Sequence, residues 1–384
     1  MTDRYRIAHV HWAFPPTTGG VESHLYDLAR LQVSRGHQVT VVTGEPEPTS
    51  TGDYEIVSTP LLQLASIRDA EVDPGYARDL RVTLCAVLAE RGIEVVHAHD
   101  LHHFTPEPAL VLTELRGELG FSLHHTFHET WPDVLADRPV YRTWDRNYAV
   151  STFVQTGCER RLGFRPLLFP LAVDTTAFRR SRPAFSRPDE SVLLHPARLL
   201  PWKGVHHTIE LLDLLRGRGF TPRLLLTDTQ RIADWDGELD KYREEINELI
   251  LAKGLRDQVE FISPRFDEMP ALYNRADIVL YPTVADEPFG LVPLEAMSSE
   301  RPIVASRCGG IAETVVHGVT GYTTDPGDVQ ALAACVVRLL RDGAAARAMG
   351  AAGRRHVRER FDLSAYGSAL DAHYAAGRNG RSPT

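Results

Sequence analysis

Two carboxylates stand eight residues apart in the segment DEPFGLVPLE, at Glu287 and Glu295. The proline and glycine between them are ordinary start signals, so the simplest prediction is a helix that begins near Gly290. The first amides of a helix lack intrahelical acceptors and carry partial positive charge, which suits a phosphate group. Here those amides would belong to Gly290, Leu291 and Val292. Because the two carboxylates would flank this cradle and accept hydroxyl groups, the segment predicts a nucleotide-sugar site.

Two cations, Arg198 and Lys203, follow a predicted strand in the segment ARLLPWKG. Cations in such a loop are often only solvated side chains. Lysine is scarce, however, with three among the 42 basic residues, so a lysine at this place carries some weight. A diphosphate leaving group needs fixed cations near its oxygens. The loop therefore predicts a diphosphate clamp.

A second glycine-containing turn, PPTTGG, follows the first predicted strand and precedes a helix. Tight-turn geometry alone explains such a glycine pair in about half of cases. The turn lacks the three spaced glycines of a dinucleotide-binding fingerprint. It therefore does not indicate a nicotinamide cofactor.

Histidines gather at three predicted strand ends, in HVH, HAHDLHH and HHTFHE. Metal hydrolases collect zinc ligands at such places, and HAHDLHH comes near the HxHxDH run of the metallo-β-lactamase-like hydrolases. Its aspartate stands one place early, and strand residues two apart share a face without any metal. A zinc site is therefore an alternative supported by ligand spacing alone.

The bulk composition limits the possible partners. A chain of 384 residues exceeds what one hydrophobic core usually organises, which predicts two domains. The net charge is −9 and neither half is basic, which argues against nucleic acid or an anionic membrane as the main partner. The four cysteines lack metal or redox spacing, no charged leader precedes an apolar run, and no apolar stretch reaches the roughly 18 residues of a membrane span. We therefore expect a cytoplasmic protein.

The elements that must position these residues alternate between strands and helices. A strand at 6–12, a helix at 21–36 and a strand at 38–43 open the chain as a βαβ unit. A second series begins with a strand at 191–199, after the Pro- and Arg-rich segment 178–191, whose composition suits a linker. This alternation predicts two doubly wound α/β halves. Since such sheets bind ligands beyond the carboxyl ends of their strands, both glycine turns should face a central cleft.

Several segments together resemble the retaining glycosyltransferases of family 4, which have the two-domain GT-B fold. They are, in order, GGVE with GHQVTVVTG, TFHE, ARLLPWKG, ALYNRADIVLYPT, DEPFGLVPLEAMSS, PIVASRCGGIAETVVHG and TGYTTDPGD. The resemblance covers nearly the whole chain. It implies a Rossmann-like acceptor domain at 1–178, a linker at 179–190, a Rossmann-like donor domain at 191–360, and a C-terminal helix at 361–384 that returns to the first domain.

The resemblance also implies roles for matching residues. His128 matches the histidine beside the transferred sugar, Glu287 the first glutamate of the E-x7-E motif, which lies against that sugar, and Glu295 the second, which binds the ribose. His128 and Glu287 are the expected catalytic residues, with retention of anomeric configuration and with no metal or other cofactor. The expected donor-binding residues are Gly19, Gly20, Arg198, Lys203, Arg265, Phe289, Gly290, Leu291, Val292 and Glu295.

The expected reaction moves a sugar from a nucleotide-sugar, with UDP-sugars such as UDP-GlcNAc favoured, to a hydroxyl of a small soluble acceptor. Acidic residues near strand ends, Asp100, Glu129 and Asp133, would suit a cationic acceptor such as an aminocyclitol in natural-product biosynthesis. No nucleic acid and no stable membrane association are expected. The alternatives are a zinc-dependent hydrolase that uses the histidine clusters and a GT-B-like sugar-nucleotide epimerase.

Overall fold

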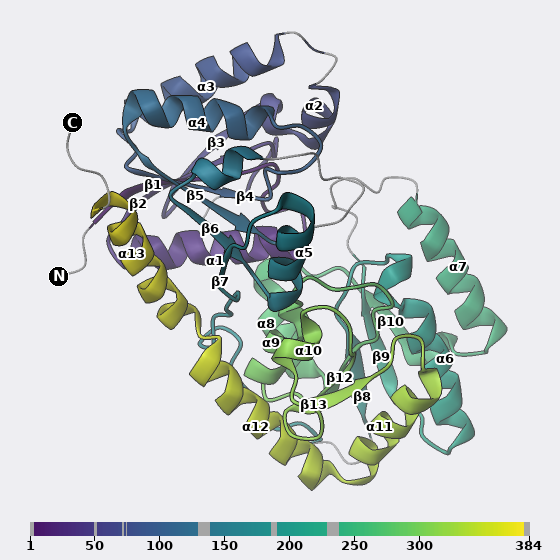
Figure 1. The fold of residues 1–384 in the computed structure, drawn as a ribbon. Coiled ribbons are helices and arrows are strands. Elements are labelled where there is room, and N and C mark those ends of the chain that lie inside the picture. Colours follow the sequence, from purple (N-terminus) through teal and green to yellow (C-terminus); the bar gives the residue numbers. More distant parts are fainter. Residues whose placement is uncertain are drawn as a thin grey trace. The chain divides into compact units, whose positions relative to one another are not determined.

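The computed structural model of the protein describes residues 4–49, 52–70, 73, 75–129, 139–185, 190–228 and 238–379. The chain divides into two compact units. Unit 1 comprises Met1–Leu171 with Leu363–Thr384, and unit 2 comprises Ala172–Asp362. Each unit holds one parallel sheet with helices packed on it (Figure 1), so the prediction of two Rossmann-like α/β domains is confirmed. Within the described residues, no helix is long and apolar enough to cross a membrane.

The sheet of unit 1 has seven parallel strands in the order β3-β2-β1-β4-β5-β6-β7. The chain winds outward to one edge from β1 and to the other edge from β4, and ligands of such sheets bind beyond the strand ends at this point. In the strand register His9 lies opposite His97, and His97 lies opposite His124. The strands are β1 (Arg6–His11), β2 (Gln38–Thr43), β3 (Glu55–Ser58), β4 (Val95–His99), β5 (Ser122–Phe127), β6 (Arg146–Ala149) and β7 (Leu167–Leu168).

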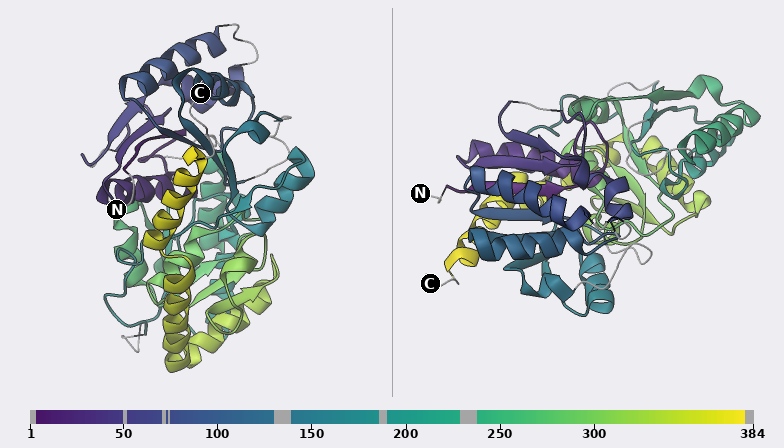
Figure 2. Two further views of the ribbon diagram at one scale, coloured as in Figure 1. Left: turned by 60° about the vertical axis from the view of Figure 1, so that its left-hand side comes forward. Right: turned by 90° about the horizontal axis from the view of Figure 1, so that it is seen from above.

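The C-terminal helix α13 belongs to unit 1, where it contacts α1 and β5 (yellow in Figures 1 and 2). Arg35 Nη2 donates to Asp371 Oδ2 at 2.7 Å, and His37 Nε2 lies 3.2 Å from the other carboxylate oxygen. Tyr374 of the same helix is fully buried. These contacts hold α13 on the unit. The described α-helices of unit 1 are α1 (Gly20–Ser34), α2 (Leu64–Asp69), α3 (Tyr76–Glu90), α4 (Glu107–Leu119), α5 (Thr152–Leu162) and α13 (Leu363–Asn379).

The sheet of unit 2 has six parallel strands in the order β10-β9-β8-β11-β12-β13. Its core joins Leu193, Leu224, Ile278 and Val304 from neighbouring strands to apolar side chains of α6, α7 and α11. A strand that is buried on both faces has a continuous apolar sequence, as in the segment IVLY of β11. The strands are β8 (Val192–His195), β9 (Arg223–Thr227), β10 (Val259–Ile262), β11 (Ile278–Tyr281), β12 (Ile303–Ser306) and β13 (Gly321–Thr324).

The helices of unit 2 follow its strands in alternation, which is the pattern expected of a doubly wound sheet. A short 3-10 turn, η4 (Pro201–Lys203), precedes the first of them. The described α-helices of unit 2 are α6 (Val205–Gly217), α7 (Glu238–Ala252), α8 (Met269–Arg275), α9 (Leu291–Ser298), α10 (Ile311–Thr314), α11 (Val329–Arg341) and α12 (Gly343–Arg360).

The segment expected to be a linker is packed on unit 2 over its described part. The ring of Phe178 lies 5.6 Å from that of Tyr273, and Arg182 Nη1 donates to Asp277 Oδ1 at 3.2 Å. Buried Arg301 in turn donates to the backbone carbonyl of Arg182 at 2.7 Å. Arginines and prolines are typical of connectors, but here the arginines have specific acceptors in the unit. Residues 178–185 are therefore part of unit 2.

Candidate active site

The carboxyl ends of β8 and β11 lie side by side where the strand order of unit 2 changes direction. β8 leads into the loop with Arg198 and Lys203, and β11 leads into the loop with Glu287. A backbone hydrogen bond connects the two loops, since Val284 N donates to Trp202 O at 2.8 Å. This is the position at which doubly wound sheets bind ligands.

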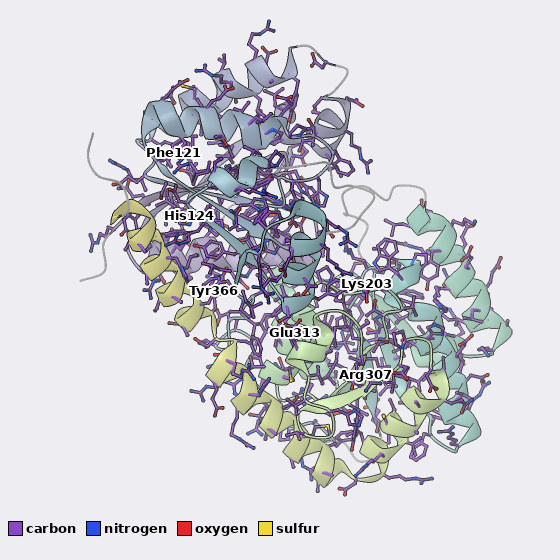
Figure 3. The ribbon with its side chains drawn as sticks, in the orientation of Figure 1. Phe121, His124, Lys203, Arg307, Glu313 and Tyr366 are labelled. Atoms are coloured by element: carbon purple, nitrogen blue, oxygen red, sulfur yellow. The ribbon has the colours of Figure 1, made fainter. Side chains whose placement is uncertain are left out.

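Lys203, Tyr281 and Glu287 form a compact triangle at this position (Lys203 is labelled in Figure 3). Lys203 Nζ donates to Glu287 Oε2 at 2.5 Å and to Tyr281 Oη at 2.9 Å. Tyr281 Oη donates to the same carboxylate oxygen at 2.8 Å. Burial would raise the pKa of Glu287, but the charge of Lys203 and these two hydrogen bonds outweigh it and lower the pKa below its ordinary value. Glu287 is therefore an anion at neutral pH.

The helix α9 begins at Leu291, directly beyond the Glu287 loop. Gly290 is its N-cap with φ of 82°, a left-handed conformation that favours glycine, and its end has no side-chain cap. The amides of Gly290, Leu291 and Val292 are thus the first of the helix and have no intrahelical acceptor. The predicted helix start is confirmed.

Glu295 lies one turn inside α9, where Tyr273 Oη donates to its Oε2 at 2.6 Å. Burial raises the pKa of Glu295 to about 7, and the hydrogen bond from Tyr273 offsets only part of that rise. The side chain therefore changes charge near physiological pH.

Three glycines hold the Glu287 loop by direct contact with its backbone. A Cβ on Gly204 would lie 2.0 Å from Pro282 O, one on Gly309 would lie 2.1 Å from Glu287 O, and one on Gly310 would lie 2.4 Å from Pro288 O. Gly310 N also donates to Glu287 O at 2.7 Å. The position of the carboxylate is thus set by main-chain packing that admits no side chain.

His128 of unit 1 follows β5 and is 4% exposed. Its Nε2 lies 3.1 Å from His99 Nδ1, and its backbone amide donates to Asp100 Oδ1 at 2.7 Å. Burial, reinforced by neighbouring histidines, lowers the pKa of His128 well below its ordinary value. The imidazole is therefore neutral at physiological pH.

Two carboxyl groups lie near His128 in unit 1. Asp100 is buried with φ of 48°, and burial, together with nearby Glu129, raises its pKa well above the ordinary value. Glu129 Oε1 lies 3.0 Å from His103 Nε2. Asp100 and Glu129 thus belong to one polar cluster at the carboxyl ends of β4 and β5, with Asp100 buried and Glu129 partly exposed.

Among the described residues, two histidine-containing groups have potential metal-ligand atoms within 4.8 Å of one another. In the first, every ring nitrogen already has a hydrogen-bonding partner, which is typical of a polar network. In the second, His102 Nε2 lies 3.0 Å from Glu129 O, and His103 Nε2 lies 3.0 Å from Glu129 Oε1. The groups are His9 with His97 and His99, and Asp100 with His102 and His103.

Two family models match the chain in succession. Glycosyltransferase Family 4 matches residues 18–177, and Glycosyl transferases group 1 matches residues 178–356. The chain belongs to glycosyltransferase family 4. The matches include residues 18–20 of the turn before α1, both cationic residues after β8, and the whole Glu287 loop with α9.

The glycosyltransferase is 27% identical to glycogen synthase of Mycobacterium tuberculosis, over 98% of this chain and 95% of the relative. It is 28% identical to the GDP-mannose-dependent alpha-(1-6)-phosphatidylinositol monomannoside mannosyltransferase of the same organism, over 92% of this chain and 93% of the relative. The solved structure of Anabaena Alr3699/HepE in complex with UDP and glucose matches with a TM-score of 0.77 and 21% identity, over 97% of this chain and 100% of that one. The fold is GT-B, as predicted.

The structure gathers most of the predicted donor-binding residues of the glycosyltransferase in unit 2. Lys203 and Glu287 are in contact beside the N-terminus of α9, and the charge of Arg198 also acts on Glu287. Phe289 is buried, and its ring centroid lies 6.1 Å from that of Phe361, so Phe289 packs in the interior of unit 2. Arg265 lies apart, exposed after the edge strand β10 and paired with Asp267 at 2.6 Å.

In unit 1, Gly19 is the N-cap of α1 in an extended conformation, with φ of −168°, and Gly20 is the first residue of that helix. The carboxylate of Glu22 is so close that a Cβ on Gly19 would lie 2.1 Å from its Oε2. Glu22 Oε1 also lies 3.5 Å from His11 Nε2. Asp133, the third acidic residue predicted near the acceptor, lies outside the described residues.

Sequence reasoning missed Tyr273 and Tyr281, the two hydroxyl donors to the motif carboxylates, and missed Glu22. Tyr281 ends a buried strand directly before the Glu287 loop, and this position was a usable signal. Tyr273 comes from α8, and nothing in its spacing links it to Glu295.

Replacing Gly309 with alanine in the glycosyltransferase should lower kcat/KM by about tenfold or more, because the backbone contact with Glu287 must open and displace the carboxylate. The measurement is steady-state kinetics together with thermal unfolding. The matched control is Gly318→Ala, since Gly318 also has positive φ but has open space around it, and that variant should lose only about 1 to 2 kcal/mol of stability. Equal activity in the two variants would contradict the role given to Gly309.

Stability should depend on pH through Glu295. Its pKa is about 7 in the fold against an ordinary value of 4.5, so between these values the folded state binds more protons than the unfolded state. The free energy of unfolding should therefore fall as pH rises through this window. Glu295→Gln removes the titrating group and should flatten this dependence, as measured by the thermal midpoint at several pH values. A slope unchanged by the substitution would show that another group is responsible.

Proposed function

We propose that this glycosyltransferase moves a sugar from a nucleotide-sugar with retention of anomeric configuration. The observation that carries the proposal is the contact of Lys203 with Glu287 beside the N-terminus of α9. When the sugar leaves, negative charge builds on the diphosphate oxygens. Lys203, Arg198 and the first amides of α9 are positioned to stabilise that charge.

Retention follows in this proposal from attack on the same face that the diphosphate leaves. The leaving phosphate accepts the proton of the acceptor hydroxyl while the new glycosidic bond forms. Glu287 is an anion, because Lys203 lowers its pKa, and its carboxylate positions the donor sugar. His128 is proposed as a further contact to that sugar through its neutral ring. No metal or other cofactor takes part, and the protein acts in the cytoplasm.

The proposed donor is a UDP-sugar such as UDP-GlcNAc. A UDP complex of a protein with the same fold supports uracil as the base of the donor. A GDP-mannose-dependent relative supports guanine as the alternative base. The proposed acceptor is a small cationic molecule, for example an aminocyclitol in natural-product biosynthesis. The buried carboxyl group of Asp100 supports this choice, because a cation would favour its ionised form.

A thermal-shift screen tests the donor. At 100 times its dissociation constant, the correct nucleotide-sugar should stabilise the protein by about 2.7 kcal/mol. UDP-GlcNAc, UDP-glucose and GDP-mannose would be compared under the same conditions, and stabilisation by GDP-mannose alone would overturn the assignment of uracil.

The reaction itself is tested by NMR of the product formed with candidate aminocyclitols. Retention predicts the same anomeric configuration in donor and product. Loss of activity with a chelator would favour the zinc hydrolase, and formation of a free or epimerised sugar without any acceptor would favour hydrolysis or epimerisation.

A further inference from the structure

Four side chains of unit 1 form an unbroken series of hydrogen bonds that ends at His128. Gln32 Oε1 on α1 lies 2.7 Å from His9 Nε2, and His9 Nδ1 lies 3.0 Å from His99 Nε2. His99 Nδ1 lies 3.1 Å from His128 Nε2. We call Gln32, His9, His99 and His128 the imidazole chain. None of the four is more than 4% exposed, so water does not compete for these contacts.

All three imidazoles of the chain are neutral at physiological pH. Burial lowers the pKa of His9 to about 4, although its bond to Gln32 opposes the shift. Burial and neighbouring histidines lower the pKa values of His99 and His128 well below the ordinary range. A neutral imidazole has one N–H donor and one acceptor nitrogen. A ring that uses both nitrogens must therefore donate to one neighbour and accept from the other.

The direction is set at Gln32, because an amide oxygen can only accept. His9 therefore donates from Nε2 to Gln32 and accepts at Nδ1, which makes His99 the donor from its Nε2. His99 then accepts at Nδ1 from His128 Nε2. The amide nitrogen of Gln32 lies 3.5 Å from Tyr374 Oη, an arrangement that leaves the amide oxygen facing His9.

We propose that the imidazole chain locks His128 as its Nε2–H tautomer and presents Nδ1 as a hydrogen-bond acceptor for a sugar hydroxyl. His128 Nδ1 is buried and has no hydrogen-bonding partner among the described residues. Gln32, His9 and His99 are then positioning residues that act through His128. The assignment of the hydroxyl to the donor sugar rests on the proposed function, whereas the tautomer does not.

The tautomer is measured directly by two-bond proton–nitrogen correlation spectra of the full chain labelled with nitrogen-15 histidine. The His128 signals are assigned by their absence in His128→Gln. Protonated Nε2 with unprotonated Nδ1 is the expected result. Protonated Nδ1, or a mixture of both forms, in the wild-type protein would overturn the proposal.

Gln32→Met removes the anchoring oxygen while keeping a side chain of similar length. We expect mixed tautomers of His128 and a fall in kcat of about five- to tenfold, the effect of losing one hydrogen bond, with KM for the donor unchanged. The matched control is Gln155→Met, since Gln155 is also buried in unit 1 but donates to Pro166 O instead. It should leave the His128 spectrum unchanged.

An unchanged His128 spectrum in Gln32→Met would refute the anchoring role. If the spectra behave as expected but His128→Gln keeps full kcat, the imidazole chain stands and the proposed contact of His128 with the sugar fails. The two proposals can thus fail separately.

Discussion

Lys203→Met is expected to lower kcat by about 100- to 1,000-fold, because one preorganised stabiliser of transition-state charge is typically worth about 3 to 4 kcal/mol. Lys203 is 7% exposed and its ammonium is fixed by both Tyr281 and Glu287, so solvent cannot replace it. Steady-state kinetics with saturating donor would measure the loss. Lys253→Met is the matched control, since Lys253 follows α7, is partly exposed, and pairs with Asp213 of α6 at 3.0 Å. This variant should keep full activity.

The same substitution also leaves Glu287, whose side chain is 15% exposed, as an anion without its cation, which is expected to cost about 3 kcal/mol of stability. The double variant Lys203→Met/Glu287→Gln removes both charges and should recover most of that stability in thermal unfolding. It should remain inactive. Recovery of activity together with stability would mean that Lys203 serves the fold alone.

Glu287→Gln is expected to lower kcat by about 100-fold, because the amide keeps the shape of the side chain but loses the charge that is proposed to orient the donor sugar. The residual product should keep the anomeric configuration of the donor, as read by NMR. Asp286→Asn is the matched control, since Asp286 is the adjacent carboxylate of the same loop but is exposed. We expect it to retain near-normal turnover.

A larger effect would change the proposed mechanism. Removal of a covalent nucleophile typically costs about a millionfold in kcat. A loss of that size in Glu287→Gln, with a trapped glycosyl-enzyme in the wild-type protein, would replace same-face attack by a covalent route. Full activity in Glu287→Gln would instead remove Glu287 from catalysis altogether.

Much of the fold and part of the site could be predicted because they depend on local sequence. The alternating strands and helices follow from apolar periodicity and glycine stops, and the start of α9 follows from Pro288 and Gly290. Lys203 and Glu287 each follow a buried strand, and the carboxyl ends of parallel strands meet at one edge. Their types and positions were therefore enough to suggest one site.

The contacts within that site could not be predicted, because they join distant segments. Lys203 and Glu287 are 84 residues apart, and their direct ion pair depends on the pairing of β8 with β11. The histidine clusters were visible in the sequence, but ring nitrogens of His9 and His97 have hydrogen-bonding partners from α1 and α13. His97 and Tyr374, for example, are 277 residues apart. Spacing along one strand cannot distinguish such a network from a set of zinc ligands.

The linker prediction shows the limit of composition. Arg182 lies in a Pro- and Arg-rich segment, yet its guanidinium and carbonyl both bond to unit 2. Such bonds depend on Asp277 and Arg301, which come about a hundred residues later in the chain. The composition of the segment indicates that it lacks helices and strands, but it does not indicate whether the segment packs on a domain.

The glycine contacts under the Glu287 loop bear on how donor preference could be engineered. Since Gly204, Gly309 and Gly310 fix the loop through its main chain, outward-facing side chains such as Val284 can be varied without moving the carboxylate. A library directed at new sugar substrates should therefore randomise those outward positions and leave the three glycines intact.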